Sequence, residues 1–219
     1  MDNHTDRDSA GRSLDDYPRP SVAVDTAVLT VDPDVGLSVL QVRRSGGRGW
    51  SLPGTFLHEA ETLADAVNRS LADRANIRGL RPRQLHVFDE LGRDDRGWVL
   101  SVAHIAVVPV EQLAARFADS TRLVSADSPG RLIYDHVDII VRAVDDLRAR
   151  YASAPDPDHL LGDEFTLRDL RLIHEAIAGK SLQRDTFRRA MESRLAPTDG
   201  VAAGGRGRPA ALFRRSEAH

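Results

Sequence analysis

The segment from residue 50 to residue 77 constrains the fold of this chain most, because a tight turn leads into a helix with one apolar face. The turn is Leu-Pro-Gly at residues 52–54. Beyond it, apolar residues recur at every fourth position, at Leu63, Val67 and Leu71. This is the spacing of an amphipathic helix that buries one face. An amphipathic helix alone leaves the turn and the spacing of Glu61 and Arg69 unexplained.

The same segment resembles a Nudix box, whose pattern is G-x5-E-x7-R-E-U-x-E-E-x-G-U with U aliphatic. Glu61, Arg69 and Ile77 match this pattern. Other positions depart from it: Thr55, preceded by Gly54, stands at the first glycine, and Asn76 stands at the last. The metal-binding glutamates of the pattern are replaced by Ser70, Asp73 and Arg74.

The resemblance implies a helix whose glutamates would hold Mg²⁺ against a diphosphate. Mg²⁺ prefers octahedral oxygen ligation by carboxylates and substrate phosphates. Only Glu61 and Asp73 remain near the ligand positions, Asp73 is one methylene shorter than glutamate, and Arg74 would repel the ion. We therefore expect no catalytic residue, no metal site and no metal-assisted cleavage of a phosphoanhydride. The segment indicates a hydrolase fold converted to sensing.

The composition is that of a globular protein of one large or two small domains, with 219 residues of which 41% are hydrophobic. Cysteine is absent, which excludes disulfides and thiolate metal sites. No apolar run approaches the length of a membrane span, so we expect a cytoplasmic protein without a membrane partner. The polar residues 1–16 are expected to be a disordered leader rather than a targeting peptide.

Charge is distributed unevenly along the chain. Residues 1–163 carry 19 basic and 26 acidic side chains, whereas residues 164–219 carry 11 basic and 7 acidic side chains. A basic module attached to an acidic domain favours binding of a polyanion by the C-terminal part, although a basic surface is often only a solvated face.

Apolar patterns predict an α/β domain over residues 17–152. Strands are expected at 22–31, 37–42, 85–88 and 98–108, and helices at 111–117 and 135–151, in addition to the helix of the Nudix-like box. Strands that alternate with helices indicate an α/β body, and the Nudix resemblance implies that this body is an α/β/α sandwich. The Ala-Pro-Asp-Pro-Asp stretch at 154–158 then marks a break, after which we expect a second domain over residues 153–219.

The second domain is predicted to be a winged helix-turn-helix. Thr166 and Asp169 form a capping-box pattern, and the helix they begin is expected to bury Leu167, Leu170, Ile173 and Ile177 and to stop at Gly179. A second helix is expected from Arg184 to Leu195, with Phe187, Met191 and Leu195 facing inward. The exposed positions would then include Thr186, Arg188, Arg189 and Glu192.

A glycine-rich basic turn follows and leads into an apolar strand that ends near Phe213. This arrangement suits insertion of the second helix into the major groove, with Arg206 and Arg208 reaching DNA from the wing. The DNA-binding residues we predict are Arg184, Thr186, Arg188, Arg189, Arg206 and Arg208. The alternative is a small helical dimerisation unit whose arginines lie in water.

Taken in order, motifs in both halves resemble those of the Nudix-related transcriptional regulators of the NrtR family. The motifs are Tyr17-Pro-Arg-Pro-Ser-Val-Ala-Val-Asp25, Trp50-Ser-Leu-Pro-Gly54, Arg93-Asp-Asp-Arg-Gly-Trp98 followed by Ser101-Val-Ala103, Tyr134-Asp-His136, Phe165-Thr-Leu167 and Arg206-Gly-Arg-Pro209. The resemblance covers residues 17–215. Two positions depart from the family, Thr55 where a second glycine is usual and Asp95 where proline is frequent.

The resemblance implies a homodimer that holds palindromic double-stranded operator DNA of NAD-metabolism genes. The Nudix-like domain would bind ADP-ribose or a related NAD-derived nucleotide and release the DNA, with no cofactor required. Two alternatives stay open. The first is a hydrolase of ADP-ribose-like dinucleotides with an accessory DNA-binding tail, and the second is a scaffold protein that binds neither nucleotide nor DNA.

A diphosphate ligand calls for guanidinium groups, and the family places its pocket where Arg43, Arg44, Arg93 and Arg96 lie. Trp50 and Phe56 are candidates for stacking on adenine or ribose, unless both pack in the core. The candidate partners for ribose hydroxyls are the carboxylates of Glu59, Glu61, Asp73 and Asp94. His136 is expected to pack, or to bond within its own helix, rather than to touch the ligand.

Overall fold

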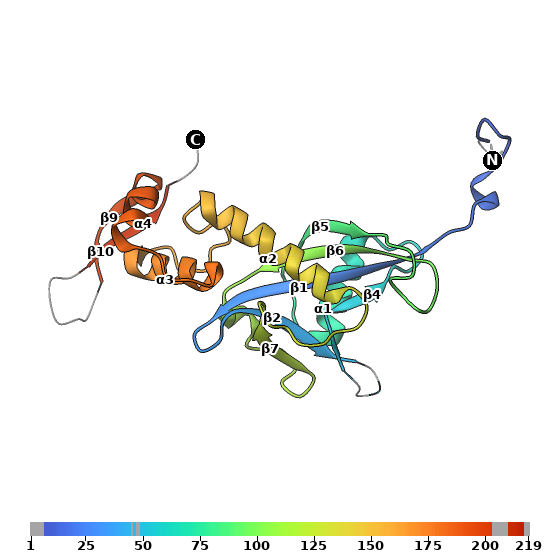
Figure 1. The fold of residues 1–219 in the computed structure, drawn as a ribbon, viewed down its shortest axis with the longest axis horizontal. Coiled ribbons are helices and arrows are strands. Elements are labelled where there is room, and N and C mark those ends of the chain that lie inside the picture. Colours follow the sequence, from blue (N-terminus) through green and yellow to red (C-terminus); the bar gives the residue numbers. More distant parts are fainter. Residues whose placement is uncertain (1–6, 45, 47–48, 203–209, 217–219) are drawn as a thin grey trace.

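The computed structural model describes residues 7–44, 46, 49–202 and 210–216. It contains a larger N-terminal body and a smaller C-terminal unit, joined through a long helix (Figure 1). In the described part of the chain, no helix is both long and apolar enough to cross a membrane.

A mixed seven-stranded sheet forms the centre of the larger body. Its strands are β1 (Ser21–Asp32), β2 (Gly36–Arg43), β3 (Trp50–Ser51), β4 (Gly54–Phe56), β5 (Arg83–Phe88), β6 (Val99–Val107) and β7 (Thr121–Ser125). The order is β3-β2-β1-β6-β5, with β4 paired to β1 and β7 to β2. The central pair β1 and β6 is parallel, with Ser21 opposite Val99, and the other pairs are antiparallel.

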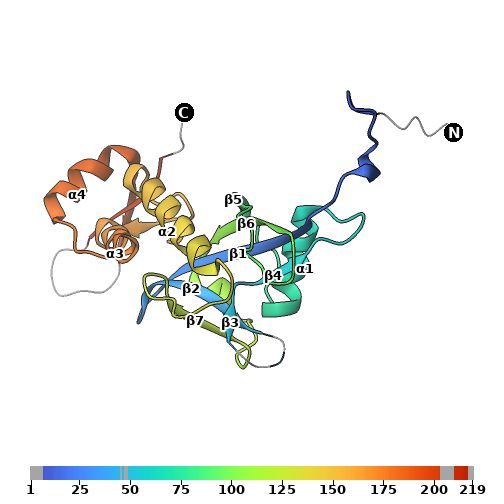
Figure 2. The ribbon, with the colours of Figure 1, turned by 45° about the vertical axis from the view of Figure 1, so that its right-hand side comes forward.

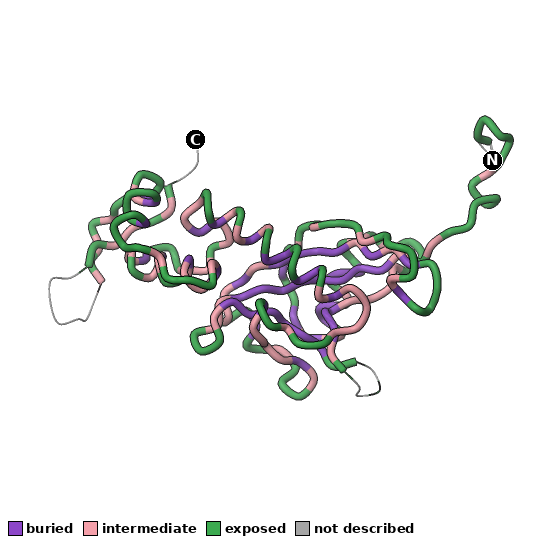
Figure 3. The backbone as a smooth tube through the Cα atoms, in the orientation of Figure 1, coloured by how far each residue is buried: buried purple, intermediate pink, exposed green. Residues whose placement is uncertain are grey.

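Two helices cover opposite faces of this sheet and confirm the expected α/β/α sandwich. Alternate residues of β1 point to opposite faces: Val24 and Val28 join a core with α1 (Leu63–Ala75), and Ala27 and Leu29 join a core with α2 (His136–Ser153). Figure 2 shows α2 on one side of the sheet and α1 on the other, and Figure 3 shows burial concentrated in the strands between them.

Three short segments differ from the sequence-based expectations. Leu63, expected to be buried with Val67 and Leu71, is only half-buried at the first turn of α1. The expected helix at 111–117 is one 3-10 turn, η2 (Val110–Leu113), because the backbone of Phe117 is bonded to Ala75 and Thr121 instead. Within the expected disordered leader, the described residues include a 3-10 turn, η1 (Leu14–Asp16).

The C-terminal unit has the predicted winged-helix elements. They are β8 (Phe165–Thr166), α3 (Leu167–Ala178), α4 (Arg184–Met191), η3 (Glu192–Arg194), β9 (Leu195–Val201) and β10 (Ala211–Arg215), and the strand order is β8-β10-β9. The expected second helix at 184–195 is shorter than predicted. A 3-10 turn ends it and frees Leu195 to begin β9, where it stays buried.

Helix α3 begins and ends as its sequence predicts but divides its apolar residues between two cores. Thr166 and Asp169 form the capping box, and Gly179 ends the helix at φ 67°, a left-handed conformation that glycine adopts without strain. Leu170 lies in the winged-helix core. Ile177, 1% exposed, belongs to the core under α2 in the larger body, and Ile173 packs against it. Of the four residues expected to be buried, Leu170 and Ile177 are buried and Leu167 and Ile173 are half-buried, and α3 contacts the cores of both units.

The segment between α2 and β8 is also fixed by polar contacts. Asp156 is buried and accepts hydrogen bonds from the Tyr151 hydroxyl at 2.7 Å and from the backbone N–H of Leu160 and Leu161. Arg215, at the end of β10, pairs with the same carboxylate. The break expected at 154–158 is thus a bonded junction between the body and the C-terminal unit.

Candidate functional site

A polar pocket of about 280 Å³ opens at one end of the sheet. Its walls come from β1, the residue after β2, the end of β3 and the turn that follows it, β4, the turn between β5 and β6, the last turn of α1 and the start of α2. The predicted residues that line it are Arg44, Phe56, Arg93, Asp94 and Arg96. Residues that the sequence reasoning did not assign to the ligand also line it: Asp25, Arg74, Ile133, Tyr134 and His136.

Arg96 lies at the mouth of the pocket, in contact with two aromatic rings. Its guanidinium carbon is 4.8 Å from the ring centroid of Phe56 and 5.1 Å from that of Tyr134, which is cation–π geometry. The guanidinium also pairs with the buried Asp94, which raises the pKa of Arg96 and lowers that of Asp94. The side chain remains 54% exposed, so Arg96 presents a positive charge beside two rings.

Arg93 lies deeper and is occupied by protein carboxylates. Its side chain is 3% exposed, its Nε donates to Asp135 at 2.7 Å, and its Nη2 lies 3.8 Å from Asp25. Burial acts to lower the pKa of Arg93, but the hydrogen bond and charge of Asp135 outweigh it and raise the pKa. Arg93 therefore neutralises the carboxylates in the floor of the pocket, and its contact with a ligand stays a prediction.

Asp25 is the carboxylate at the centre of this floor. Burial acts to raise its pKa, but the interactions with His136, together with the Ser101 hydroxyl and Arg93, hold the pKa below its ordinary value. Ser101 donates to Asp25 Oδ2 at 2.6 Å, and His136 Nε2 lies 3.3 Å from Oδ1. Asp25 is thus an ionised group fully occupied by neighbours.

His136 forms its bonds outside its own helix and lines the pocket. Its Nδ1 accepts a hydrogen bond from the backbone N–H of Leu52 at 2.9 Å, and its other ring nitrogen faces Asp25. The expectation that it packs is met, since it is buried, but its partners come from β1 and the turn after β3. His136 therefore joins the first turn of α2 to β1 and to the turn after β3.

Three predicted ligand residues are not among those that line the pocket. Arg43 stacks on Trp50 at 5.1 Å, and Arg122 covers the same ring at 4.2 Å, so Trp50 is already stacked by protein cations. Glu61 pairs with Arg69 through Nε at 2.7 Å and Nη2 at 2.8 Å. This hydrogen bonding, with a second from the backbone of His58, lowers the pKa of Glu61 to about 2.

Glu61 and Arg69 have a structural role in this arrangement. Arg69 also donates to the Thr55 hydroxyl at 3.0 Å and to the Phe56 carbonyl at 2.9 Å. The pair therefore ties α1 to β4 and to the loop before the helix. Glu59 and Asp73, considered for ribose, are exposed and are not among the lining residues either.

The three replaced box positions occupy different environments on α1. Ser70 is 2% exposed, and its hydroxyl has no hydrogen-bond partner among the described residues. Asp73 is exposed, whereas Arg74 lines the pocket. The described part of the chain has no cluster of three or more histidine, cysteine, aspartate or glutamate side chains suited to a metal ion. Where a box helix would present carboxylates, α1 presents a guanidinium group.

Helix α4 offers the exposed basic face that the sequence predicts. Arg184, Thr186, Arg188 and Arg189 are all exposed, and Phe187 and Met191 are buried beneath them. Arg188 pairs with Glu192 one turn later at 2.9 Å. Predicted wing residues Arg206 and Arg208 lie outside the described residues.

The face of α4 is divided in a way that the sequence did not reveal. Arg184 and Arg188 line a groove of about 680 Å³ that runs between α3, α4 and β10, whereas Thr186 lines a different cavity against α2. Positions 184 and 188 are one turn apart, and 186 lies on the other side of the helix. Two arginines from α3, Arg168 and Arg171, also line the groove.

Comparisons with known proteins match both parts of the chain. Residues 157–215 match the model of the NrtR DNA-binding winged helix domain. The ADPR-responsive transcriptional repressor NtrR of Acinetobacter baylyi is 30% identical over 210 residues, which cover 91% of this chain and 83% of that protein. An ADP-ribose pyrophosphatase of Methanocaldococcus jannaschii is 28% identical over 126 residues, 57% of this chain and 73% of that protein.

Solved structures of NrtR from Shewanella oneidensis show the same architecture. The complex with a 27mer DNA has a TM-score of 0.74 and 29% identity, covering 89% of this chain and 93% of that chain. The Nudix domain of that protein complexed with ADP-ribose has a TM-score of 0.53 and 25% identity, covering 63% and 95%. With the winged-helix match and the Acinetobacter relative, these likenesses show that the chain belongs to the NrtR family of Nudix-related transcriptional regulators.

Proposed function

We propose that this protein is a DNA-binding repressor of NAD-metabolism genes and that its Nudix-like domain senses ADP-ribose or a related nucleotide. The observation that carries the proposal is the arginine-lined pocket of a domain docked onto a winged helix through Ile177. Relatives described as ADPR-responsive, as bound to DNA and as bound to ADP-ribose support it. Ligand binding is expected to release the operator DNA.

The pocket suits a nucleoside diphosphate sugar chemically. Arg44, Arg74 and Arg96 supply guanidinium groups around it, and guanidinium forks match phosphate oxygens. Phe56 and Tyr134 place aromatic faces at the mouth, where a base or ribose can replace the contact that Arg96 now makes. Arg93 would act beneath the ligand by keeping Asp25 and Asp135 neutralised, so that the floor does not repel phosphate.

We propose that the domain binds its ligand without hydrolysing it. In metal-assisted cleavage, Mg²⁺ bridges protein carboxylates and the diphosphate. Ser70 and Arg74 remove two of those carboxylates, and Arg74 is placed to meet the diphosphate directly. A guanidinium group then provides the countercharge that the ion would otherwise provide. It provides no activated water.

Incubation with ADP-ribose and Mg²⁺ tests this part of the proposal. A thermal-shift titration should show that ADP-ribose raises the melting temperature, because a ligand that binds only the folded state stabilises it. Chromatography of the same mixture should show no AMP. AMP release at ordinary enzymatic rates would favour the second candidate function, a hydrolase with an accessory DNA-binding tail. The similarity to an ADP-ribose pyrophosphatase supports this alternative.

The DNA-binding part is proposed to comprise residues 153–219, with Arg184, Arg188 and Arg189 of α4 as its reading residues and Arg206 and Arg208 as wing contacts. Arg168 and Arg171 on the other wall of the groove extend the proposal to phosphate contacts. The protein would act in the cytoplasm, on chromosomal DNA.

We further propose a homodimer on a palindromic operator, because palindromes mirror two-fold symmetry and a single winged helix makes few contacts. Helix α2 has an exposed side that includes Val141, which is 53% exposed, and this side is our candidate for part of the interface. Sedimentation at micromolar concentration should show a dimer. A monomer that binds its operator with one-to-one stoichiometry would contradict the proposal.

A further inference from the structure

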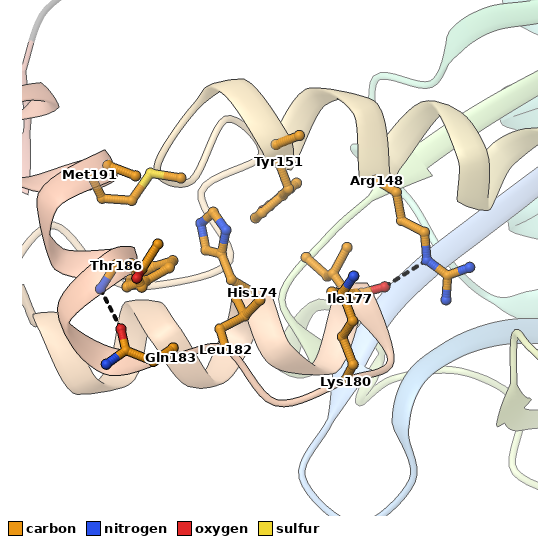
Figure 4. A pocket seen from close by; sticks show the side chains of 13 residues that line it. Arg148, Tyr151, His174, Ile177, Lys180, Leu182, Gln183, Thr186 and Met191 are labelled. Atoms are coloured by element: carbon orange, nitrogen blue, oxygen red, sulfur yellow. Dashed lines mark hydrogen bonds between the residues drawn. The ribbon is translucent and has the colours of Figure 1, made fainter.

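A second cavity, of about 460 Å³, lies between α2, α3 and α4 and shares no lining residue with the polar pocket (Figure 4). Its inner walls are buried side chains from all three helices, Tyr151, His174, Ile177, Phe187 and Met191. Figure 4 shows Tyr151, His174 and Met191 directed toward one another across this space. Its volume and apolar walls are those of small-molecule sites.

The walls are aromatic, and the polar atoms of two of the rings are already bonded to protein. The rings of Tyr151 and Phe187 pack edge to face against His174, with centroids 5.1 Å and 5.0 Å away. The Tyr151 hydroxyl donates to Asp156, and His174 Nε2 lies 2.6 Å from the Pro155 carbonyl. Burial lowers the pKa of His174, so the ring is neutral at neutral pH. Such walls favour a flat aromatic ligand.

The rim adds positive charge. Arg148 is engaged, because its Nε donates to the Ile177 carbonyl at 2.8 Å and its Nη2 to Asp127 at 2.7 Å. Lys180, the only lysine of the chain, lies exposed on the same rim. Within the described residues it forms no ion pair. A ligand with an anionic group at this end would supply the missing partner.

We propose that this cavity binds a small aromatic carboxylate, with the ring among Tyr151, His174 and Phe187 and the carboxylate at Lys180. The site is separate from the nucleotide pocket, and its existence does not depend on the function proposed above. Phe187 and Met191 form the buried face of α4, so an occupant would touch the back of the helix that we propose reads DNA.

Calorimetric titration of the full chain with 2-naphthoate, and with the uncharged 2-naphthalenemethanol, tests the proposal. Ala152 is exposed and lines the cavity, so Ala152→Phe should fill it and weaken naphthoate binding about tenfold or more, whereas Ala152→Ser should retain binding. Ala178→Leu and Ala178→Ser form a second pair on α3, should the first filled variant not fold. Affinity for ADP-ribose should be the same in all four variants.

The variant Lys180→Gln tests the contribution of the lysine charge separately from that of the aromatic contacts. This variant should bind 2-naphthoate several-fold more weakly and 2-naphthalenemethanol as the parent does. Unchanged naphthoate binding in both filled variants, or no binding by the parent up to the solubility limit of the probe, would overturn the site. Unchanged naphthoate binding in Lys180→Gln would overturn the proposal that the ligand carries an anionic group bound by Lys180.

Discussion

Arg93 donates a hydrogen bond from Nε to Oδ2 of Asp135 over 2.7 Å, and this contact joins the pocket to the helix that reaches the winged unit. Asp135 is the N-cap residue of α2, whose first residue, His136, faces Asp25 across the pocket floor. At the other end of α2, Tyr151 bonds to Asp156, which also holds Arg215 of β10. A ligand that moves Arg93 or Asp25 therefore acts on an element bonded to both units.

Arg96 and Arg93 are predicted to respond differently to substitution, although they are three residues apart. Arg96→Ala should weaken ADP-ribose binding at least tenfold with little change in melting temperature, because this exposed side chain faces the pocket mouth. Arg93→Ala should lower the free energy of unfolding by about 3–5 kcal/mol, since it leaves buried carboxylates without their cation. Thermal denaturation and ligand titration of both variants check the pair. Equal stability of the two would show that the Arg93 network is not structural.

Gly54→Ala is predicted to disturb the same floor. A Cβ at residue 54 would lie 2.1 Å from Asp25 Oδ1 and 3.0 Å from the Val24 carbonyl. Asp25 is held by Ser101 and His136, so it has little room to move. We expect a loss of roughly 1–3 kcal/mol in the free energy of unfolding and weaker ADP-ribose binding. Gly92→Ala is a control for steric clash, because no atom lies near its Cβ position, although its positive φ adds strain. Unaltered stability and ligand binding in Gly54→Ala would contradict this prediction.

Arg188→Ala and Arg184→Ala should weaken binding to operator DNA without affecting ADP-ribose. Both side chains are exposed and line the groove beside α3, so truncation opens no core cavity. Loss of a base contact should cost about 1–3 kcal/mol, and loss of a phosphate contact should lower the salt slope by about one. Fluorescence anisotropy at several salt concentrations distinguishes the two cases. Thr186→Ala, on the other side of α4, is the matched comparison, and a larger loss there than at Arg188 would show that the wrong face was assigned.

Acidification is expected to destabilise the protein through its buried histidines. Burial lowers the pKa of His104 and of His174 below the ordinary value of about 6.5, so the unfolded chain binds protons that the folded chain does not. The stability from the neutral rings is complete above the unfolded pKa and is lost as the pH falls below it. The melting temperature should decrease from about pH 7.5 to about pH 5.5. In His174→Phe the decrease should be smaller, and an equal slope would exclude His174 as a cause.

Local signals in the sequence predicted the elements that depend on local chemistry. The Thr166 and Asp169 capping box and the stop at Gly179 bound α3 as expected, because a helix end is decided by the residues beside it. Arg96 and Phe56 were correctly placed in one pocket only because a family resemblance supplied the tertiary arrangement.

Side chains whose role depends on distant partners were assigned less well. The sequence places Arg93 at the pocket but does not show that Asp25 and Asp135 surround it. Ile177 fits the apolar face of α3 by periodicity, yet it packs in the other core. From the sequence, Arg74 is expected only to replace a carboxylate and to repel Mg²⁺; its place in the pocket wall follows from the structure.

The most direct test of a ligand-responsive repressor is release of operator DNA by ADP-ribose, measured by anisotropy on a palindromic duplex selected by the parent protein. The parent should release this DNA as ADP-ribose saturates the pocket, and Arg96→Ala should hold the same DNA at concentrations that detach the parent, because a ligand shifts an equilibrium only through its differential affinity for the two states. Arg188→Ala should still bind ADP-ribose. Equal DNA affinity of the parent with and without saturating ADP-ribose would contradict the account.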